Sequence, residues 1–193
     1  YERAHAARRT YNLALVNLSA LADRPPGGRA SRAWELLYPR PYEPELSALE
    51  RENGLPPNFL YAIMRQESAF DPDEVSSAEA IGLLQMIPPT TRRVAVAMGI
   101  EYTDDALFDV HVNLATGARY IGALYRKFGG QLPLVIGSFN AGPRAMARFV
   151  DRFGDRPTDE FVELITYDQT RTYVRRVLSA LARPTASQRI EVP

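Results

Sequence analysis

The amino-acid sequence predicts an all-α protein with at most a minor β-hairpin. Apolar residues recur with a helical period almost throughout from Glu45 onward, whereas alternating, strand-like runs are scarce. Proline, glycine and capping residues divide the chain into segments of ordinary helix length. Because 193 residues suffice for one well-filled core, we expect one principal domain preceded by short helical segments.

The N-terminal residues predict a first helix and a linker. Residues 6–21 have a helix-forming composition, and Leu13, Val16 and Leu21 are its expected apolar positions. The run Pro25-Pro26-Gly27-Gly28 then breaks the helical pattern.

A second short helix is expected at residues 34–38 and ends at Pro39. Further prolines follow, so we place a domain boundary after residue 44. Residues 1–44 are then a helical N-terminal segment and linker, which could be the end of a superhelical domain. Residues 45–193 form the main domain.

The sequence of the main domain predicts eight helices. Seven are expected at residues 45–53, 58–69, 90–98, 110–128, 133–141, 143–153 and 158–165. Asp168 opens the eighth, whose expected buried face consists of Tyr173, Val174, Val177, Leu178 and Leu181.

Composition excludes several classes of function. Lysine plus arginine and aspartate plus glutamate number 23 each, so no global field attracts nucleic acid or an anionic membrane. The chain has no cysteine and only His5 and His111, which excludes disulfide scaffolds, cysteine-based zinc sites and thiol catalysis. We therefore expect no nucleic-acid partner.

The beginning of the chain indicates a processed or excised fragment. Its first residue is Tyr1 rather than methionine, and no signal peptide is visible. No run approaches the roughly 18 apolar residues of a membrane-spanning helix. Any export signal would lie upstream.

Glu67 is the first candidate for chemistry. It lies near the end of an apolar helical run, four residues after Ile63 and three after Met64, which puts its carboxyl beside the core face. Burial disfavours the charged carboxylate and raises its pKa toward the working pH, as a group that acts first as acid and then as base requires. A surface glutamate flanked by Arg65 is the alternative.

Two further segments carry amides in apolar surroundings. Gln85 lies within Gly82-Leu83-Leu84-Gln85-Met86-Ile87-Pro88, where it either binds a sugar hydroxyl or caps a buried turn. Asn140 follows Phe139 at the end of a helix of small residues, where a sugar ring could stack on the aromatic face. An ordinary helix C-cap is the alternative for this second segment.

The order and spacing of these segments resemble the catalytic domain of soluble lytic transglycosylases, goose-lysozyme-like enzymes that cut bacterial peptidoglycan. The resemblance lies in Glu67-Ser68, in Gly82 to Pro88 and in Phe139 to Pro143. It covers roughly residues 46–181 and implies a lysozyme-like α-helical fold for residues 45–193. It also implies a periplasmic or cell-envelope location, peptidoglycan strands as partner and a monomer, with a possible helical superhelix domain upstream.

The resemblance implies a reaction with one carboxylate. Glu67 would protonate the oxygen that links N-acetylmuramic acid to N-acetylglucosamine, and would then take the proton of the muramic acid C6 hydroxyl, which closes a 1,6-anhydro ring. Because this nucleophile is internal, the resemblance implies that no second carboxylate, no metal and no cofactor is needed. The residues implied to bind substrate are Ser68, Ser76, Gln85, Ile87, Phe139, Asn140 and Gln169.

Four positions depart from the family pattern. Phe139 replaces a tyrosine whose hydroxyl is thought to help place the catalytic carboxyl, and Gln169 replaces a common glutamate. Ile87 replaces a methionine, and Glu79 replaces a glycine, which puts a left-handed turn in question. Two alternatives stay open. The first is a goose-type lysozyme on the same fold, which hydrolyses the bond with Asp71, Glu74 or Glu79 as second carboxylate. The second, indicated by Phe139 and Gln169, is a weakly active glycan-binding domain.

Overall fold

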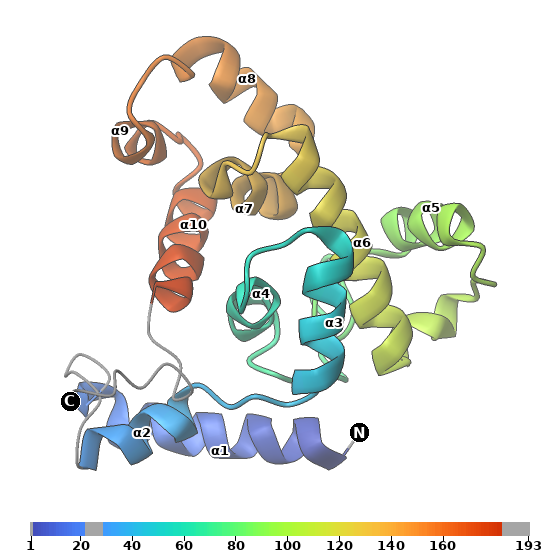
Figure 1. The fold of residues 1–193 in the computed structure, drawn as a ribbon, viewed down its shortest axis with the longest axis vertical. Helices are drawn as coiled ribbons and strands as arrows, with labels where there is room; N and C mark the ends of the chain where they lie inside the picture. Colours follow the sequence, from blue (N-terminus) through green and yellow to red (C-terminus); the bar gives the residue numbers. More distant parts are fainter. Residues whose placement is uncertain (1, 22–28, 183–193) are drawn as a thin grey trace.

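The computed structural model describes residues 2–21 and 29–182, which form a bundle of helices (Figure 1). The all-α prediction is confirmed. The helices are α1 (Glu2–Leu18), α2 (Arg29–Leu37), α3 (Glu43–Asn53), α4 (Phe59–Glu67), α5 (Pro88–Met98), α6 (Val110–Lys127), α7 (Leu132–Ala141), α8 (Pro143–Phe153), α9 (Thr158–Glu163) and α10 (Asp168–Leu181). Two short 3-10 helices, η1 (Ser19–Leu21) and η2 (Asp104–Phe108), complete the list, and η2 was not expected.

β structure within the described residues is limited to single bridges in the loop between α4 and α5. Ile81 pairs with Val75 on one side and with Met86 on the other. The described residues thus hold isolated bridges without a strand, which is within the limit of a minor hairpin that the sequence predicts. No described helix is both long and apolar enough to cross a membrane.

The central helix of the bundle is α4. Its six successive residues from Phe59 to Met64 are all buried, as expected for a helix that is apolar on every side. Both α3 and α10 pack against α4, and the long helix α6 contacts α3, α5 and α7 (Figure 1). Helix α4 therefore packs against its neighbour in sequence, α3, and against α10, which follows it by 100 residues.

The N-terminus of α4 is capped by a side chain of α3. Oε2 of Glu50 accepts a hydrogen bond from the backbone N–H of Asn58 at 2.9 Å, and Oε1 accepts one from Leu60 at 2.9 Å. Asn58 itself provides no side-chain cap. A carboxylate satisfies backbone donors here and lies at the positive end of the helix dipole.

The loop after α4 is seated on α6 by one buried asparagine. Oδ1 of Asn113 accepts from the backbone N–H of Leu84 at 3.0 Å, and its Nδ2 donates to Ile81 O at 2.8 Å and Leu107 O at 3.1 Å. Gly82 lies so close that a Cβ there would stand 2.5 Å from Asn113 Nδ2. The glycine that opens the second motif therefore serves a close approach of backbone to side chain.

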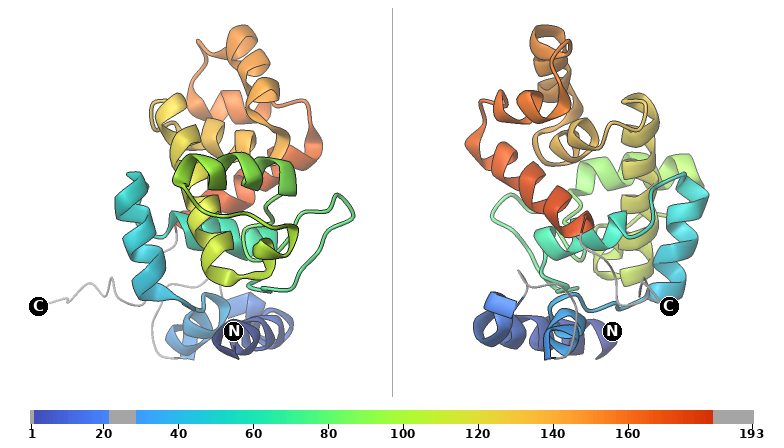
Figure 2. Two further views of the ribbon diagram at one scale, coloured as in Figure 1. Left: turned by 90° about the vertical axis from the view of Figure 1, so that its right-hand side faces the viewer. Right: turned by 60° about the vertical axis from the view of Figure 1, so that its left-hand side comes forward.

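The first helix buries a different side from the one expected. Leu13 and Val16 are 68% and 81% exposed, whereas Ala7, Tyr11 and Ala14 are buried. Tyr11 belongs to the same apolar core as α4. Helix α1 packs on α2, and both lie at one end of the molecule (Figure 2). The expected linker at residues 25–28 lies outside the described residues.

Candidate active site

Glu67 is the last residue of α4 and faces a cleft of about 450 Å³. Helices α4, α7 and α10 supply the walls of this cleft, although α7 and α10 follow α4 by more than 60 residues. The residues that line it are Gln66, Glu67, Asn140, Asp168, Gln169, Thr172, Tyr173 and Arg176. The structure thus brings together three of the expected site residues: Glu67, Asn140 and Gln169.

The Glu67 carboxyl is held by Tyr173. The buried phenol of this α10 residue donates a hydrogen bond to Oε1 of Glu67. Burial raises the pKa of Glu67 to about 7, and the Tyr173 hydrogen bond opposes this rise because it favours the charged form. A carboxyl with this pKa is populated in both protonation states near neutral pH.

Asn140 is oriented by α10. Oγ1 of the buried Thr170 donates to Asn140 Oδ1 at 2.8 Å, so the oxygen of the amide points toward α10. An amide that is fixed in this way presents its remaining polar edge in a defined direction. Gln169, the neighbour of Thr170, adds a second amide to the same cleft.

Ser68, Ser76, Gln85 and Ile87 are not among the residues that line this cleft. Oγ of the buried Ser68 donates to Leu83 O at 2.9 Å and so ties the end of α4 to the following loop. Nε2 of Gln85 donates to the backbone oxygens of Glu74 and Gly82 at 3.0 and 3.1 Å.

The other two residues shape the same loop. Oγ of Ser76 accepts from Ala78 and Ala80, and the carbonyl of Ile87 accepts from the first turn of α5. The hydrogen bonds of Gln85 to its own loop are those expected if this residue caps a buried turn. Substrate binding by these four residues stays a prediction.

Phe139 packs against a tyrosine of α6. Its ring centroid lies 6.0 Å from that of Tyr120, with a tilt of 46° between the rings. The ring is partly buried against the core, next to the cleft residue Asn140. Phe139 has no hydroxyl, and the phenol that donates to Glu67 belongs to Tyr173 on another helix.

Tyr173 is the functional candidate that sequence reasoning missed. The sequence placed it on the buried face of the last helix but assigned it no chemistry. The available signal was a tyrosine, rather than a phenylalanine, on a fully buried helix face, since a buried phenol needs a hydrogen-bond partner. The partner's identity depends on the crossing of α10 and α4.

Glu79 retains the left-handed turn that the family pattern assigns to glycine. Its φ is 60°, and Ser76 closes the turn through a bond from the backbone N–H of Glu79 to Ser76 O at 3.0 Å. Glu79 therefore adopts the left-handed conformation although it is not a glycine. A non-glycine residue pays about 1–2 kcal/mol for it.

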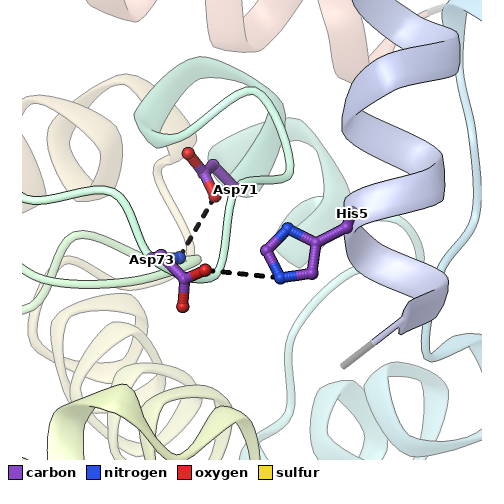
Figure 3. A group of neighbouring side chains, drawn as sticks. All are labelled: His5, Asp71 and Asp73. Carbon is purple, nitrogen blue, oxygen red and sulfur yellow. Dashed lines mark hydrogen bonds and ion pairs between the residues drawn. The ribbon is translucent and has the colours of Figure 1, made fainter.

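One group of described residues has the composition of a metal site. Ligand atoms of His5, Asp71 and Asp73 lie within 4.8 Å of one another (Figure 3). The guanidinium of Arg8 forms an ion pair with Asp71, so the charge of this buried carboxylate is already compensated. The cluster therefore functions here as an ion-pair network between α1 and the loop after α4.

The sequence of this chain is similar to those of known transglycosylases. A family model described as the transglycosylase SLT domain matches residues 46–162. A putative soluble lytic murein transglycosylase of Haemophilus influenzae is 31% identical over 77% of this chain and 26% of its own length. The soluble lytic murein transglycosylase of Escherichia coli is 29% identical over 92% of this chain and 28% of its own length.

The fold of this chain is similar to solved structures of lytic transglycosylases. The 70 kDa soluble lytic transglycosylase of Escherichia coli superposes with a TM-score of 0.74 at 29% identity, covering 92% of this chain and 29% of that one. Lytic transglycosylase Slt of Pseudomonas aeruginosa, solved as an inactive glutamate-to-glutamine mutant, gives 0.71 at 29% identity over 90% and 28%.

The chain spans about a quarter of the length of these curated relatives. The family model nevertheless covers more than half of it, including Glu67 and the two amide-bearing motifs. With the all-helical fold and the cleft at the end of α4, these matches establish that the chain belongs to the transglycosylase SLT domain family.

Proposed function

We propose that this chain cleaves the β-1,4 bond between N-acetylmuramic acid and N-acetylglucosamine in peptidoglycan without water, leaving 1,6-anhydro-muramic acid ends. The observation that carries the proposal is the half-buried Glu67 carboxyl, whose pKa is raised to about 7 at the wall of a cleft that also holds the fixed amide of Asn140. Relatives of 29–31% identity are named lytic murein transglycosylases. No cofactor enters the reaction.

The proposed cycle uses Glu67 twice. Protonated Glu67 donates its proton to the bridging oxygen, the bond from this oxygen to C1 of the muramic acid breaks, and the N-acetylglucosamine leaves with a free 4-hydroxyl. The Glu67 carboxylate then accepts the proton of the C6 hydroxyl while O6 bonds to C1. Glu67 ends protonated, so the cycle closes without consuming water.

Tyr173 would stabilise the carboxylate between these two steps. Its hydroxyl donates to the charged form of Glu67, which lowers the cost of ionisation in a partly buried position. Asn140 and Gln169 are placed to bind hydroxyl or acetamido groups of the glycan from the same cleft. Ser68, Ser76, Gln85, Ile87 and Phe139 are proposed as further contacts along the strand.

Hydrolysis is the second candidate, and Asp168 is the observation that favours it. This aspartate lines the same cleft as Glu67 and could activate a water, although its carboxylate is exposed and paired with Arg171. The residues first considered for this role lie in other contacts. Asp71 pairs with Arg8, Glu74 lies 3.8 Å from Arg8, and Glu79 lines a separate pocket.

Mass spectrometry of digested sacculi separates the two reactions. The transglycosylase releases anhydro-muropeptides, each lighter by one water than the reducing-end product of a hydrolase. Asp168→Asn should leave the anhydro products and their rate unchanged. Reducing ends that disappear in Asp168→Asn would instead establish the hydrolase.

Glu67→Gln tests whether the chain is an enzyme at all. The variant should bind sacculi in a pelleting assay but release no product. If it digests sacculi as fast as the unmutated chain, Glu67 is not the acid. If neither Glu67→Gln nor the unmutated chain digests sacculi and both bind them, the chain is a glycan-binding domain.

The setting of this activity follows from the substrate. We propose a location in the cell envelope, where peptidoglycan lies, and the periplasm as its compartment. The domain boundary after residue 44 and a monomeric state are parts of the same proposal. The superhelical domain upstream is supported by relatives about three times as long as this chain.

A further inference from the structure

The N-terminal segment contacts Arg65, which lies two positions before Glu67. The guanidinium of Arg65 lies over two aromatic rings, 5.2 Å from the ring centroid of Tyr11 on α1 and 4.6 Å from that of Tyr38 after α2. Nε of Arg65 is buried without a hydrogen-bond partner. Contacts between a cation and aromatic faces therefore connect this side chain to the N-terminal segment.

The turn that follows Glu67 has a strained backbone. Ala69 and Phe70 have φ of 50° and 68°, which costs a non-glycine residue about 1–3 kcal/mol. Such a pair persists only where neighbouring contacts hold it. The ring of Phe70 is 1% exposed and meets the ring of Tyr11 edge to face, with 5.5 Å between centroids.

The next residue is held by an ion pair from the same helix. The carboxylate of Asp71 is buried and pairs with Arg8 of α1. Figure 3 shows His5 projecting from α1 toward the same loop, with its Nε2 at 3.3 Å from Oδ2 of Asp73. A buried carboxylate that loses its cationic partner is strongly destabilised, so the geometry of this turn depends on Arg8.

From these contacts we propose that α1 is a positioning element of the active site, in which Arg8 and Tyr11 hold the turn at residues 69–71 and keep the Glu67 carboxyl against Tyr173. Helix α1 lies outside residues 46–162, the part that matches the family model. The inference rests on the proposed function only where it calls Glu67 the reacting acid. The geometric claim stands apart from it.

Loss of the contact at Arg8 should expose Glu67 to solvent. When Asp71 seeks water, the turn relaxes and the carboxyl of Glu67 becomes better hydrated, so its pKa falls from about 7 toward the ordinary value. Two charged groups of α10, Asp168 and Arg176, line the same cleft as Glu67, and Arg65 lies two residues before Glu67 on its own helix. A substitution at Arg8 alters none of these.

The test compares Arg8→Met with Arg9→Met in the whole chain. Arg9 is an exposed arginine on the same helix and serves as the matched control. Carbon-13 NMR of the glutamate carboxyls follows the titration of Glu67, and Glu67→Gln assigns its resonance. The pH profile of kcat/KM on a soluble glycan strand is the second measurement.

In Arg8→Met, we expect the titration midpoint of Glu67 and the alkaline limb of the profile to move to lower pH by about one unit. We expect kcat to fall about tenfold or more with KM little changed, because the acid is displaced from the reacting atoms. Arg8→Lys should restore most of both, and Arg9→Met should change neither.

A second pair covers the case in which Arg8→Met does not fold. Tyr11→Phe keeps the ring against Phe70 and Arg65 and should match the unmutated chain, whereas Tyr11→Leu loses the ring and should move the midpoint of Glu67 in the same direction. Thermal melts confirm that each variant is folded.

The outcomes separate the two proposals. If folded Arg8→Met and Tyr11→Leu keep the Glu67 midpoint of Arg9→Met and Tyr11→Phe, the positioning role is overturned even where the chain is active. If the midpoint moves but no variant, nor the unmutated chain, digests glycan, the positioning role holds and the proposed function fails.

Discussion

The phenolic hydroxyl of Tyr173 donates a hydrogen bond to Oε1 of Glu67, although the two residues are 106 positions apart in the chain. The contact exists because α10 packs directly on α4. Phe139 lacks the hydroxyl expected at its position, and the phenolic donor to Glu67 in this structure is Tyr173 on a different helix. The placement of the carboxyl thus depends on the crossing of two helices.

Tyr173→Phe should slow the reaction and move its pH profile. Without the donor, the pKa of Glu67 rises further above about 7, because the hydrogen bond favours the charged form. The alkaline limb of kcat/KM should move to higher pH, and kcat should fall roughly ten- to hundredfold. Tyr167→Phe, at an exposed position before α10, is the control. An unchanged alkaline limb in Tyr173→Phe would show that this hydroxyl does not affect the pKa of the catalytic acid.

Glu67→Gln should stabilise the fold at alkaline pH. The pKa of Glu67 is about 7 when folded and about 4.5 when unfolded, so the folded state binds the proton more tightly. Stability should therefore fall as pH rises from about 4.5 to about 7, with the full loss above that range. This loss is at most about 3 kcal/mol, and about 1–3 kcal/mol after allowance for the partial exposure of the side chain.

Urea unfolding at pH 4 and pH 8 measures this effect. Glu67→Gln should match the unmutated chain at pH 4 and exceed it at pH 8. Glu52→Gln, an exposed substitution on α3, should show no such difference between the two pH values. A Glu67→Gln variant that is less stable than the unmutated chain at pH 8 would show that the ionised carboxyl is well compensated.

Glu50→Ala should destabilise the fold through the N-terminus of α4. The substitution leaves the backbone N–H groups of Asn58 and Leu60 without their acceptor, at a cost of about 2–4 kcal/mol. For a chain of this size, the melting temperature should drop by roughly 5–15 °C. Glu52→Ala on the exposed side of the same helix should change it little. Equal melting temperatures for the two variants would rule out the cap.

Gly82→Ala should cost more than Gly99→Ala, although both glycines have a left-handed backbone with φ of 77° and 70°. A Cβ at Gly99 meets nothing within 4 Å, so its cost is that of the backbone alone, about 1–2 kcal/mol. At Gly82 the Cβ must also displace Asn113, which raises the cost to about 3 kcal/mol or more. Denaturant melts compare the two variants, and equal losses would mean that Asn113 adapts freely.

Local sequence determined the helices and the candidate acid. Apolar periodicity and the stops at proline and glycine predicted every α-helix of the described main domain, from α3 to α10, within a few residues. Glu67 was placed beside the core at the end of a helix from the spacing of Ile63 and Met64 alone. Side-chain periodicity and helix stops depend on residues close together in the chain, so they can be found in a single sequence.

Tertiary structure decided which side chains meet. It alone shows that α1 buries Tyr11 rather than Leu13 and Val16, because the α1 sequence offers two apolar sides and packing selects one. It also decides that the amide of Gln85 closes its own loop, and that Tyr173 reaches Glu67. Hydrogen bonds between residues 106 positions apart leave no periodic trace in the sequence, since they depend on how whole helices cross.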